Sequence, residues 1–238
     1  LLDLTPFRQL RGVLDVIYNP MRTRLTQQAR NLGLPYGDGL KMLVAQALYA
    51  MEYFLQEKQP DALVNKVCAA VRRQTVNIVL VGMAGCGKSS IGRRVAQALQ
   101  REFLDLDEAV VAEAGMSIPA IFASEGEAGF RRREKNAVAA AGQRSNLVIA
   151  SGGGAVLDRE NRYNLVQNGF VYHLLREVDK LPLQAGRPLS TNLERVRQMA
   201  AEREPLYRQI RDAAIDNNHG LAAAVKAVIA AYQDDIAR

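Results

Sequence analysis

The chain has 238 residues, of which 48% are hydrophobic and 24% are charged, and its formal net charge is +6. These values are ordinary for a globular protein of one large or two small domains, whose core needs no disulfide bonds. No apolar run approaches the roughly 18 residues of a membrane-spanning helix, and no signal peptide opens the chain, so we expect no membrane partner. The two cysteines, Cys68 and Cys86, predict no disulfide framework and are typical of a cytoplasmic protein.

The basic charge leaves two kinds of partner open: nucleic acids, or small ligands that carry phosphate or carboxylate groups. No RNA-binding, zinc-finger or helix-turn-helix signature occurs, so we expect no nucleic-acid partner. The chain begins with Leu1 rather than Met, and its first 20 residues are typical of the middle of a domain. We therefore expect it to be a fragment of a longer polypeptide.

The first 74 residues predict one short strand and three helices, with a glycine-rich loop before the second helix. The expected elements in chain order are a buried strand over residues 13–18 ended by Asn19-Pro20, and helices over residues 23–32, 40–55 and 61–73. Asp61 is placed to cap the third helix.

From residue 75 the pattern changes to short apolar strands that alternate with helices. Strands are expected over residues 76–81, 103–106, 148–150 and 169–174, and the first helix over residues 88–101. This alternation predicts an α/β fold in which a parallel sheet is covered by helices on both faces. We place a boundary near residues 73–75, so that the predicted domains are residues 1–74 and 75–238.

The first strand of the second domain leads into Gly82-Met-Ala-Gly-Cys-Gly-Lys88-Ser89, which matches the phosphate-loop pattern G-x-x-x-x-G-K-[ST]. The glycines let backbone amides turn toward a phosphate, and the following helix N-terminus adds partial positive charge. Lys88 is expected at the β- and γ-phosphates of a nucleotide such as ATP, and the Ser89 hydroxyl at Mg²⁺. The alternative is an ordinary glycine-rich turn. Residues expected to bind the nucleotide are Gly82, Gly85, Cys86, Gly87, Lys88, Ser89 and Ser90, Cys86 being a small spacer.

Two carboxylates follow the second strand, at Asp105 and Asp107. In an extended segment they would lie on one face, one near Mg²⁺ and the other near an acceptor hydroxyl. The alternative is a helix start, because Asp105 and Glu108 have capping-box spacing. The apolar strand over residues 147–151 ends in Ser151, where many phosphate-loop enzymes have an Asp, so Asp105 is the best acidic partner for the metal.

Arginines and glycines in the second half of the chain are candidates for binding an acidic substrate. Gly152-Gly153-Gly154 follows a buried strand and would allow a ligand to approach the backbone closely, although a flexible turn is the alternative. Three arginines, at 131–133, open a helix, and for Arg132 and Arg133 we favour a solvated basic face. Arg187 lies in a loop suited to a mobile lid over the phosphates, and Arg203 lies late in a helix; both could also be surface charges.

These motifs together resemble the shikimate kinase family. The phosphate loop is followed by Phe-Leu-Asp-x-Asp, Gly-Glu-x-x-Phe-Arg-x-x-Glu, Ala-Ser-Gly-Gly-Gly, Arg-Pro-Leu and Arg-x-Pro-Leu-Tyr, in the order and approximate spacing of that family. The resemblance covers about residues 75–218 and implies a P-loop, nucleoside-monophosphate-kinase-like fold. It also implies phosphorylation of shikimate by ATP, with Mg²⁺, to give shikimate 3-phosphate.

The resemblance also implies roles for individual residues. Asp107 would orient or deprotonate the attacking hydroxyl, Arg131 and Arg203 would bind the shikimate carboxylate, and Glu134 would steady Arg131. Gly152, Gly153 and Gly154 would line the substrate pocket. The catalytic set is Asp107, Lys88 and Arg187, the metal set is Ser89 and Asp105, and Lys180 is the nearest candidate for a further nucleotide contact. The run Asp216-Asn-Asn-His-Gly departs from the family's adenine-side loop, which often carries an Arg.

Residues 1–73 resemble the C-terminal end of shikimate dehydrogenase. The similarity lies in Asp15-Val-Ile-Tyr18-Asn-Pro-x-x-Thr-x-Leu and Gly39-x-x-Met-Leu-x-x-Gln46. In that family the positions of Tyr18 and Gln46 contact shikimate, and Gly39 lies near the nicotinamide. The catalytic domain and the dinucleotide-binding turn are absent, so no dehydrogenase activity is expected from this chain. The missing dehydrogenase portion would then be a covalent partner in a bifunctional parent, although these residues could instead be a helical extension packed on the kinase.

Two other functions stay open at this point. One is a kinase for another small polyol, which the triple glycine and Arg203 disfavour. The other is a non-catalytic module that binds a nucleotide or shikimate. Degenerate modules of that kind are expected to lose the loop Lys, the Asp or the lid Arg, whereas Lys88, Asp107 and Arg187 are all present.

Overall fold

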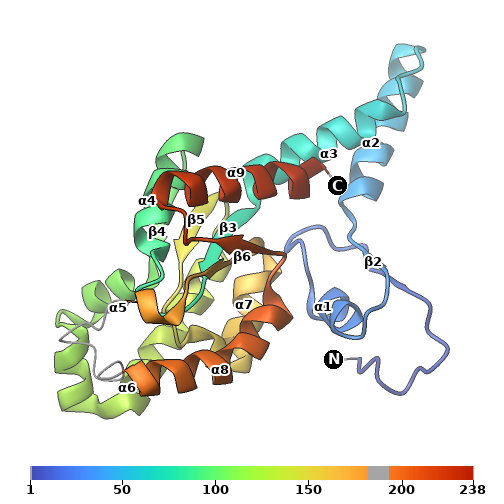
Figure 1. The fold of residues 1–238 in the computed structure, drawn as a ribbon. Coiled ribbons are helices and arrows are strands. Elements are labelled where there is room, and N and C mark those ends of the chain that lie inside the picture. Colours follow the sequence, from blue (N-terminus) through green and yellow to red (C-terminus); the bar gives the residue numbers. More distant parts are fainter. Residues whose placement is uncertain (1, 182–192, 238) are drawn as a thin grey trace.

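A five-stranded parallel sheet forms the centre of the computed structural model, which describes residues 2–181 and 193–237. The strand order is β4-β5-β3-β6-β7 (Figure 1). The strands are β3 (Asn77–Val81), β4 (Glu102–Asp105), β5 (Leu147–Ala150), β6 (Gly169–Leu175) and β7 (Ala213–Asp216). The α/β fold expected from the alternating pattern is therefore confirmed, and β7 is an additional strand that the sequence did not predict.

The central strand β3 is buried along its whole length, as its β-branched apolar run predicted. It pairs with β5 on one side and β6 on the other, with Ile78 opposite Val148 and Phe170. Because all five strands are parallel, their carboxyl ends lie at the same edge of the sheet. Ligands of open α/β sheets bind at that edge, where the phosphate loop and the triple glycine follow β3 and β5.

Helices cover both faces of the sheet. On one face Ile78 and Leu80 pack with α4 (Lys88–Leu99) and α9 (Leu221–Ala237). On the other, Val79 and Val81 pack with α6 (Ile118–Gly142) and α7 (Arg159–Gln167). The remaining elements of this part are α5 (Leu106–Ala114), α8 (Leu193–Ile210) and the short 3-10 turns η1 (Ala155–Leu157) and η2 (Val178–Lys180).

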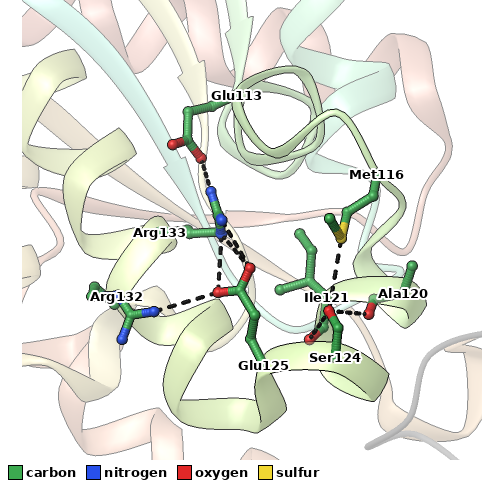
Figure 2. Close-up of polar contacts among 8 residues, drawn as sticks. All are labelled: Glu113, Met116, Ala120, Ile121, Ser124, Glu125, Arg132 and Arg133. Atoms are coloured by element: carbon green, nitrogen blue, oxygen red, sulfur yellow. Dashed lines mark hydrogen bonds and ion pairs between the residues drawn. The ribbon is translucent and has the colours of Figure 1, made fainter.

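Helix α6 is broken at Gly126, whose φ of 69° is left-handed and favours glycine. Arg133 joins the two halves: it donates to both carboxylate oxygens of Glu125, before the break, at 2.8–3.2 Å (Figure 2). It also pairs with Glu113 of α5, whereas Arg132 is mostly exposed and reaches Glu125 only at 3.4 Å. Arg132 therefore lies on a solvated face, as expected. For Arg133 the same expectation is wrong, because its guanidinium links three helical segments.

The first 75 residues form a small two-stranded parallel sheet and three helices. The strands are β1 (Val13–Leu14) and β2 (Tyr36–Gly37), and the helices are α1 (Arg24–Asn31), α2 (Leu40–Leu55) and α3 (Ala62–Thr75). The buried strand expected over residues 13–18 is wrong, since only two residues are in a strand and Leu14 is 76% exposed. Its only strand partner in the described chain is β2, and α1 contacts both strands.

Helices α2 and α3 pack against each other through Leu40, Val44 and Cys68 and project away from the sheet (Figure 1). Asp61 lies at the start of α3 but its side chain makes no capping hydrogen bond, because its backbone is already helical there; the expected cap is wrong. The far end of α2 exposes Tyr53 and Phe54. No helix in the described ranges has both the length and the apolar character needed to cross a membrane.

A buried ion pair attaches the N-terminal segment to the sheet. The Arg22 guanidinium donates to both carboxylate oxygens of Asp212, at 2.8 and 3.2 Å, and to the carbonyl of Gly169 at 2.9 Å. Asp212 also accepts from the backbone amide of Val171, so it joins this segment to the start of β6. Met21 enters the core on the same side.

We expect Arg22→Ala to lower the free energy of unfolding by on the order of 3 kcal/mol, because it leaves Asp212 buried with much of its counter-charge removed. The matched control is Arg24→Ala, whose ion pair with Glu160 is about 40% exposed, so its loss should cost less than about 1 kcal/mol. Urea unfolding followed by circular dichroism measures both. Equal, small effects would show that the Arg22 pair does not hold the segment.

Candidate active site

The phosphate loop lies between β3 and α4, where the sequence predicted it. Two of its glycines are required by close approach of other groups: a Cβ on Gly82 would lie 2.8 Å from the Leu174 carbonyl oxygen, and one on Gly87 would lie 2.9 Å from the Asn217 amide nitrogen. Both residues also have positive φ, of 142° and 97°. The loop is therefore wrapped tightly against the ends of β6 and β7.

Lys88, the first residue of α4, folds back over the loop. Its ammonium donates to the carbonyls of Gly82 at 2.8 Å and Met83 at 2.9 Å, and its side chain is largely buried. Cys86 is buried, with its sulfur 3.9 Å from the Lys88 nitrogen, in agreement with a small spacer. The loop thus holds a cation above glycine-rich backbone at a helix N-terminus, an arrangement that binds phosphate.

Ser89 and Asp105 face each other beside this loop. The Ser89 hydroxyl donates to Asp105 Oδ2 at 2.5 Å. Asp105 Oδ1 accepts from the backbone amides of Asp107 and Glu108, so this carboxylate also caps α5. The capping interpretation of Asp105 is therefore confirmed, and its other carboxylate oxygen faces Ser89. The extended segment ends at Asp105, however, so the expectation that Asp107 lies on the same strand is wrong: Asp107 is in the first turn of α5.

Gly152, Gly153 and Gly154 join the phosphate loop to a group of charged side chains. A Cβ on Gly153 would lie 2.9 Å from the backbone nitrogen of Ala84 in the loop. One on Gly152 would lie 2.6 Å from Glu134 Oε1 and 2.9 Å from Asp107 Oδ1. The glycines are thus in contact with the loop on one side and with two carboxylates on the other, so they are a spacer of fixed shape.

Arg131 and Glu134, one turn apart on α6, form an ion pair of 2.7 Å in this group. A Cβ on Gly154 would lie 2.5 Å from Arg131 Nη1, so the guanidinium occupies the space above that glycine. Burial raises the pKa of Glu134 and nearby Asp107 adds to the rise, while Arg131 opposes it. The site therefore holds two close carboxylates that depend on arginine for compensation.

Arg203 reaches the same glycines from α8. It is only 7% exposed, its Nη1 donates to the Gly153 carbonyl at 3.2 Å, and its Nε is buried without a hydrogen-bond partner in the described structure. The Tyr207 hydroxyl, one turn later, donates to the same carbonyl at 2.6 Å. Of the two interpretations of Arg203, a surface charge is wrong.

Two further residues of the site were missed from the sequence. Asn217, just after β7, donates from its side-chain amide to the Cys86 carbonyl at 2.6 Å and so supports the phosphate loop. His173, near the end of β6, stacks on Tyr207 with ring centroids 4.6 Å apart. Both lie at the carboxyl ends of strands, where parallel sheets bind their ligands. This position could have identified His173 from the sequence, because its strand was predicted. Asn217 could not be identified in the same way, because β7 was not predicted.

Two predicted nucleotide-binding residues make no contact with a bound-phosphate position in the described chain, and the predicted lid residue is not described. Lys180 is half exposed in η2 and pairs with Glu177 at 2.9 Å. Ser90 is exposed on the first turn of α4. Arg187 lies outside the described residues.

Comparisons with known proteins agree on one family. Residues 84–233 match the family model for shikimate kinase. A shikimate kinase of Bordetella pertussis is 41% identical over 182 residues, which are 73% of this chain and 86% of that protein. One of Xanthomonas oryzae pv. oryzae is 43% identical over 150 residues, or 60% of this chain and 83% of the relative. The solved structure of shikimate kinase from Acinetobacter baumannii in complex with shikimate has a TM-score of 0.61 and 35% identity, and covers 71% of this chain and 97% of that one.

The buried His173 predicts a pH dependence of stability. Burial lowers the pKa of His173 to about 4, with Arg211 and Lys88 acting in the same direction against Glu204. The unfolded chain, with a His pKa of about 6.5, takes up the proton first, so the stability contributed by neutral His173 is lost as the pH falls from about 6.5 to 4.

We expect His173→Gln to weaken the fall in urea midpoint between pH 7 and pH 5. His219→Gln, at the exposed second histidine, is the control and should keep the wild-type slope. If the urea midpoint fell equally between pH 7 and pH 5 in both variants, His173 would not contribute to the pH dependence of stability.

Proposed function

Since this chain belongs to the shikimate kinase family, we propose that it transfers the γ-phosphoryl group of ATP to a hydroxyl of shikimate, giving ADP and shikimate 3-phosphate. The observation that carries the proposal is the contact of one glycine run, Gly152 to Gly154, with both the phosphate loop and three ionisable side chains. Those side chains are Asp107, Arg131 and Glu134, and Arg203 approaches the same run from α8.

On the nucleotide side, the loop amides and the start of α4 bind the phosphates of ATP. Lys88 exchanges its two loop carbonyls for oxygens of the β- and γ-phosphates, because a charged acceptor makes the stronger hydrogen bond. Phosphoryl transfer needs positioning and charge stabilisation more than covalent chemistry. A lysine that is buried and held before the nucleotide arrives supplies both.

The neighbouring Ser89 and Asp105 fit Mg²⁺. Their oxygens, 2.5 Å apart, are a hydroxyl and a carboxylate, the hard donors that Mg²⁺ prefers, so these two residues would hold the ion. When bound, Mg²⁺ neutralises the charge that develops on the phosphate oxygens. No cluster of three or more His, Cys, Asp or Glu side chains in the described part offers a metal site of another kind.

On the acceptor side, Asp107 orients the attacking hydroxyl and accepts its proton. Arg131 and Arg203 bind the carboxylate of shikimate as two guanidinium forks, and Glu134 fixes Arg131 by their ion pair. The buried, unpartnered Nε of Arg203 is a donor ready for that carboxylate. Arg187, as the lid residue, and Lys180, as a nucleotide contact, are included in the proposed site on the family resemblance alone.

We also propose that residues 1–74 are the C-terminal part of a shikimate dehydrogenase domain and that residues 75–238 are the kinase domain of a cytoplasmic, bifunctional parent. Support comes from β1 and β2, because a parallel pair is ordinarily buried on both faces and here Leu14 and Tyr36 are exposed. The coding sequence before Leu1 tests this. A dinucleotide-binding Gly-x-Gly-x-x-Gly turn and a catalytic Lys/Asp pair are expected there, and an unrelated sequence would contradict it.

Asp107→Asn and Lys88→Ala are each expected to lower kcat by about a hundredfold or more, since each removes a group that acts on the transferred phosphoryl or the nucleophile. Glu108→Gln, in the same turn as Asp107 but exposed, is the control and should stay near wild type. A coupled assay of ADP release with shikimate measures the rates. Turnover with gluconate and none with shikimate would indicate another polyol kinase, and tight binding of ATP or shikimate without turnover would indicate a binding module.

Gly154→Ala is expected to raise the KM for shikimate about tenfold with little change in the KM for ATP, because its Cβ would displace Arg131. Gly153→Ala, whose Cβ meets the loop backbone at Ala84, should affect the KM for ATP as well. Steady-state kinetics with each substrate varied separates the two effects. If Gly154→Ala raised only the KM for ATP, the division of the site would be wrong.

Removal of divalent cations with EDTA is expected to abolish turnover, and added Mg²⁺ to restore it. Ser89→Ala should raise the Mg²⁺ concentration at half-maximal rate, because the metal loses a protein ligand. Ser124→Ala, at an exposed serine of α6, is the control. Identical Mg²⁺ dependence in both variants would exclude Ser89 as a ligand.

A further inference from the structure

A cavity of about 320 Å³ lies between α1, α7 and the last turn of α8, separate from the phosphate loop. This volume is at the lower end of the roughly 300–1,000 Å³ of small-molecule sites. None of its lining residues belongs to the glycine run or to the proposed kinase site. Two of the three elements that form it, α7 and α8, lie in the region that matches the family, whereas α1 precedes that region.

The lining of this cavity is strongly basic. Arg24 and Arg30 come from α1, and Arg159 and Arg162 from α7. Glu160 is the only carboxylate in the lining, and Asp212, which pairs with Arg30 at 3.2 Å, is shared with Arg22. The four lining guanidinium groups therefore outnumber the carboxylates beside them, which concentrates positive potential in a recess and attracts anions.

Two of these arginines are held in place by the protein. The Arg24 guanidinium lies 3.9 Å from the ring centroid of Tyr163 and pairs with Glu160. Arg162 Nη1 donates to the carbonyls of Val156 at 2.6 Å and Leu157 at 3.2 Å. Donors fixed in this way lose little conformational entropy when a ligand binds.

The other two arginines have donors to spare. Arg30 uses Nη2 for the Arg211 carbonyl at 2.7 Å and for the ion pair with Asp212 at 3.2 Å, but its Nη1 is buried with no hydrogen-bond partner among the described residues. Arg159 is exposed and forms no ion pair within the described chain. Burial lowers the pKa of Arg162 and Arg159 adds to this, against Asp158, which indicates positive charge that is incompletely compensated.

We propose that this cavity is a second anion site, which binds a small phosphate-bearing dianion between α1 and α7. Phosphate fits better than a monocarboxylate because it carries nearly two negative charges and oxygens in several directions, so it can meet forks that come from two helices. Because α1 carries the N-terminal segment and α7 belongs to the sheet domain, the bound anion links the two.

Calorimetric titration of inorganic phosphate into the full chain at low ionic strength tests the proposal. The Lys88→Ala background removes the cation of the phosphate loop, so it weakens phosphate binding there and should retain the site in the cavity. In that background Arg159→Ala should weaken the affinity for phosphate about tenfold, because a charged hydrogen bond is lost. The variant should fold normally, because this side chain is exposed and forms no ion pair in the described structure. Glu160→Gln should tighten binding by about threefold, since it frees the Arg24 fork.

Lys135→Ala is the matched control, because Lys135 is an exposed cation near α7 that does not line the cavity. It should leave the phosphate affinity unchanged. Loss of all phosphate binding in Lys88→Ala, or equal affinities in the Arg159 and Lys135 variants, would overturn the proposal. Malonate that bound while phosphate did not would overturn the assignment to phosphate.

Discussion

The site depends on a close backbone contact that leaves no room for a side chain. Gly153 lies so near the phosphate loop that a Cβ would meet the amide of Ala84 at 2.9 Å. The carbonyl of the same glycine accepts hydrogen bonds from Arg203 and Tyr207. In the proposed reaction this one peptide segment sets the distance between the nucleotide and the side chains proposed for the acceptor, and the rate of phosphoryl transfer depends on that distance.

The parallel sheet determines which groups can share this contact. The loop follows β3, Asp105 ends β4 and the glycines follow β5, and these three strands are neighbours whose carboxyl ends meet. Burial then makes charge compensation necessary: Glu134 has a raised pKa and is held by Arg131. The same low-polarity surroundings strengthen every ion pair with a bound substrate.

The N-terminal segment is attached at a different place from the site. Arg22 binds Asp212 just before β7, so α1 is held against α7, while α2 and α3 project outward (Figure 1). This attachment forms the arginine-lined cavity from α1, α7 and the last turn of α8, which are far apart in sequence. The exposed apolar residues Leu14, Tyr53 and Phe54 also belong to this segment, whereas the sheet domain buries its core on both faces.

Features that depend on neighbouring residues were determined by the sequence itself: the phosphate loop, the four apolar strands and the glycine run were predicted from local spacing, and with them the fold and the kinase family. Features that depend on distant residues were decided only by tertiary structure. Packing of α8 against the glycines buried Arg203, and the ion pair with Glu125 makes Arg133 a link between helical segments. The strand β7, made largely of alanine, and the pair of Arg22 with Asp212 have no local signal, because burial and ion pairing arise only when remote segments meet.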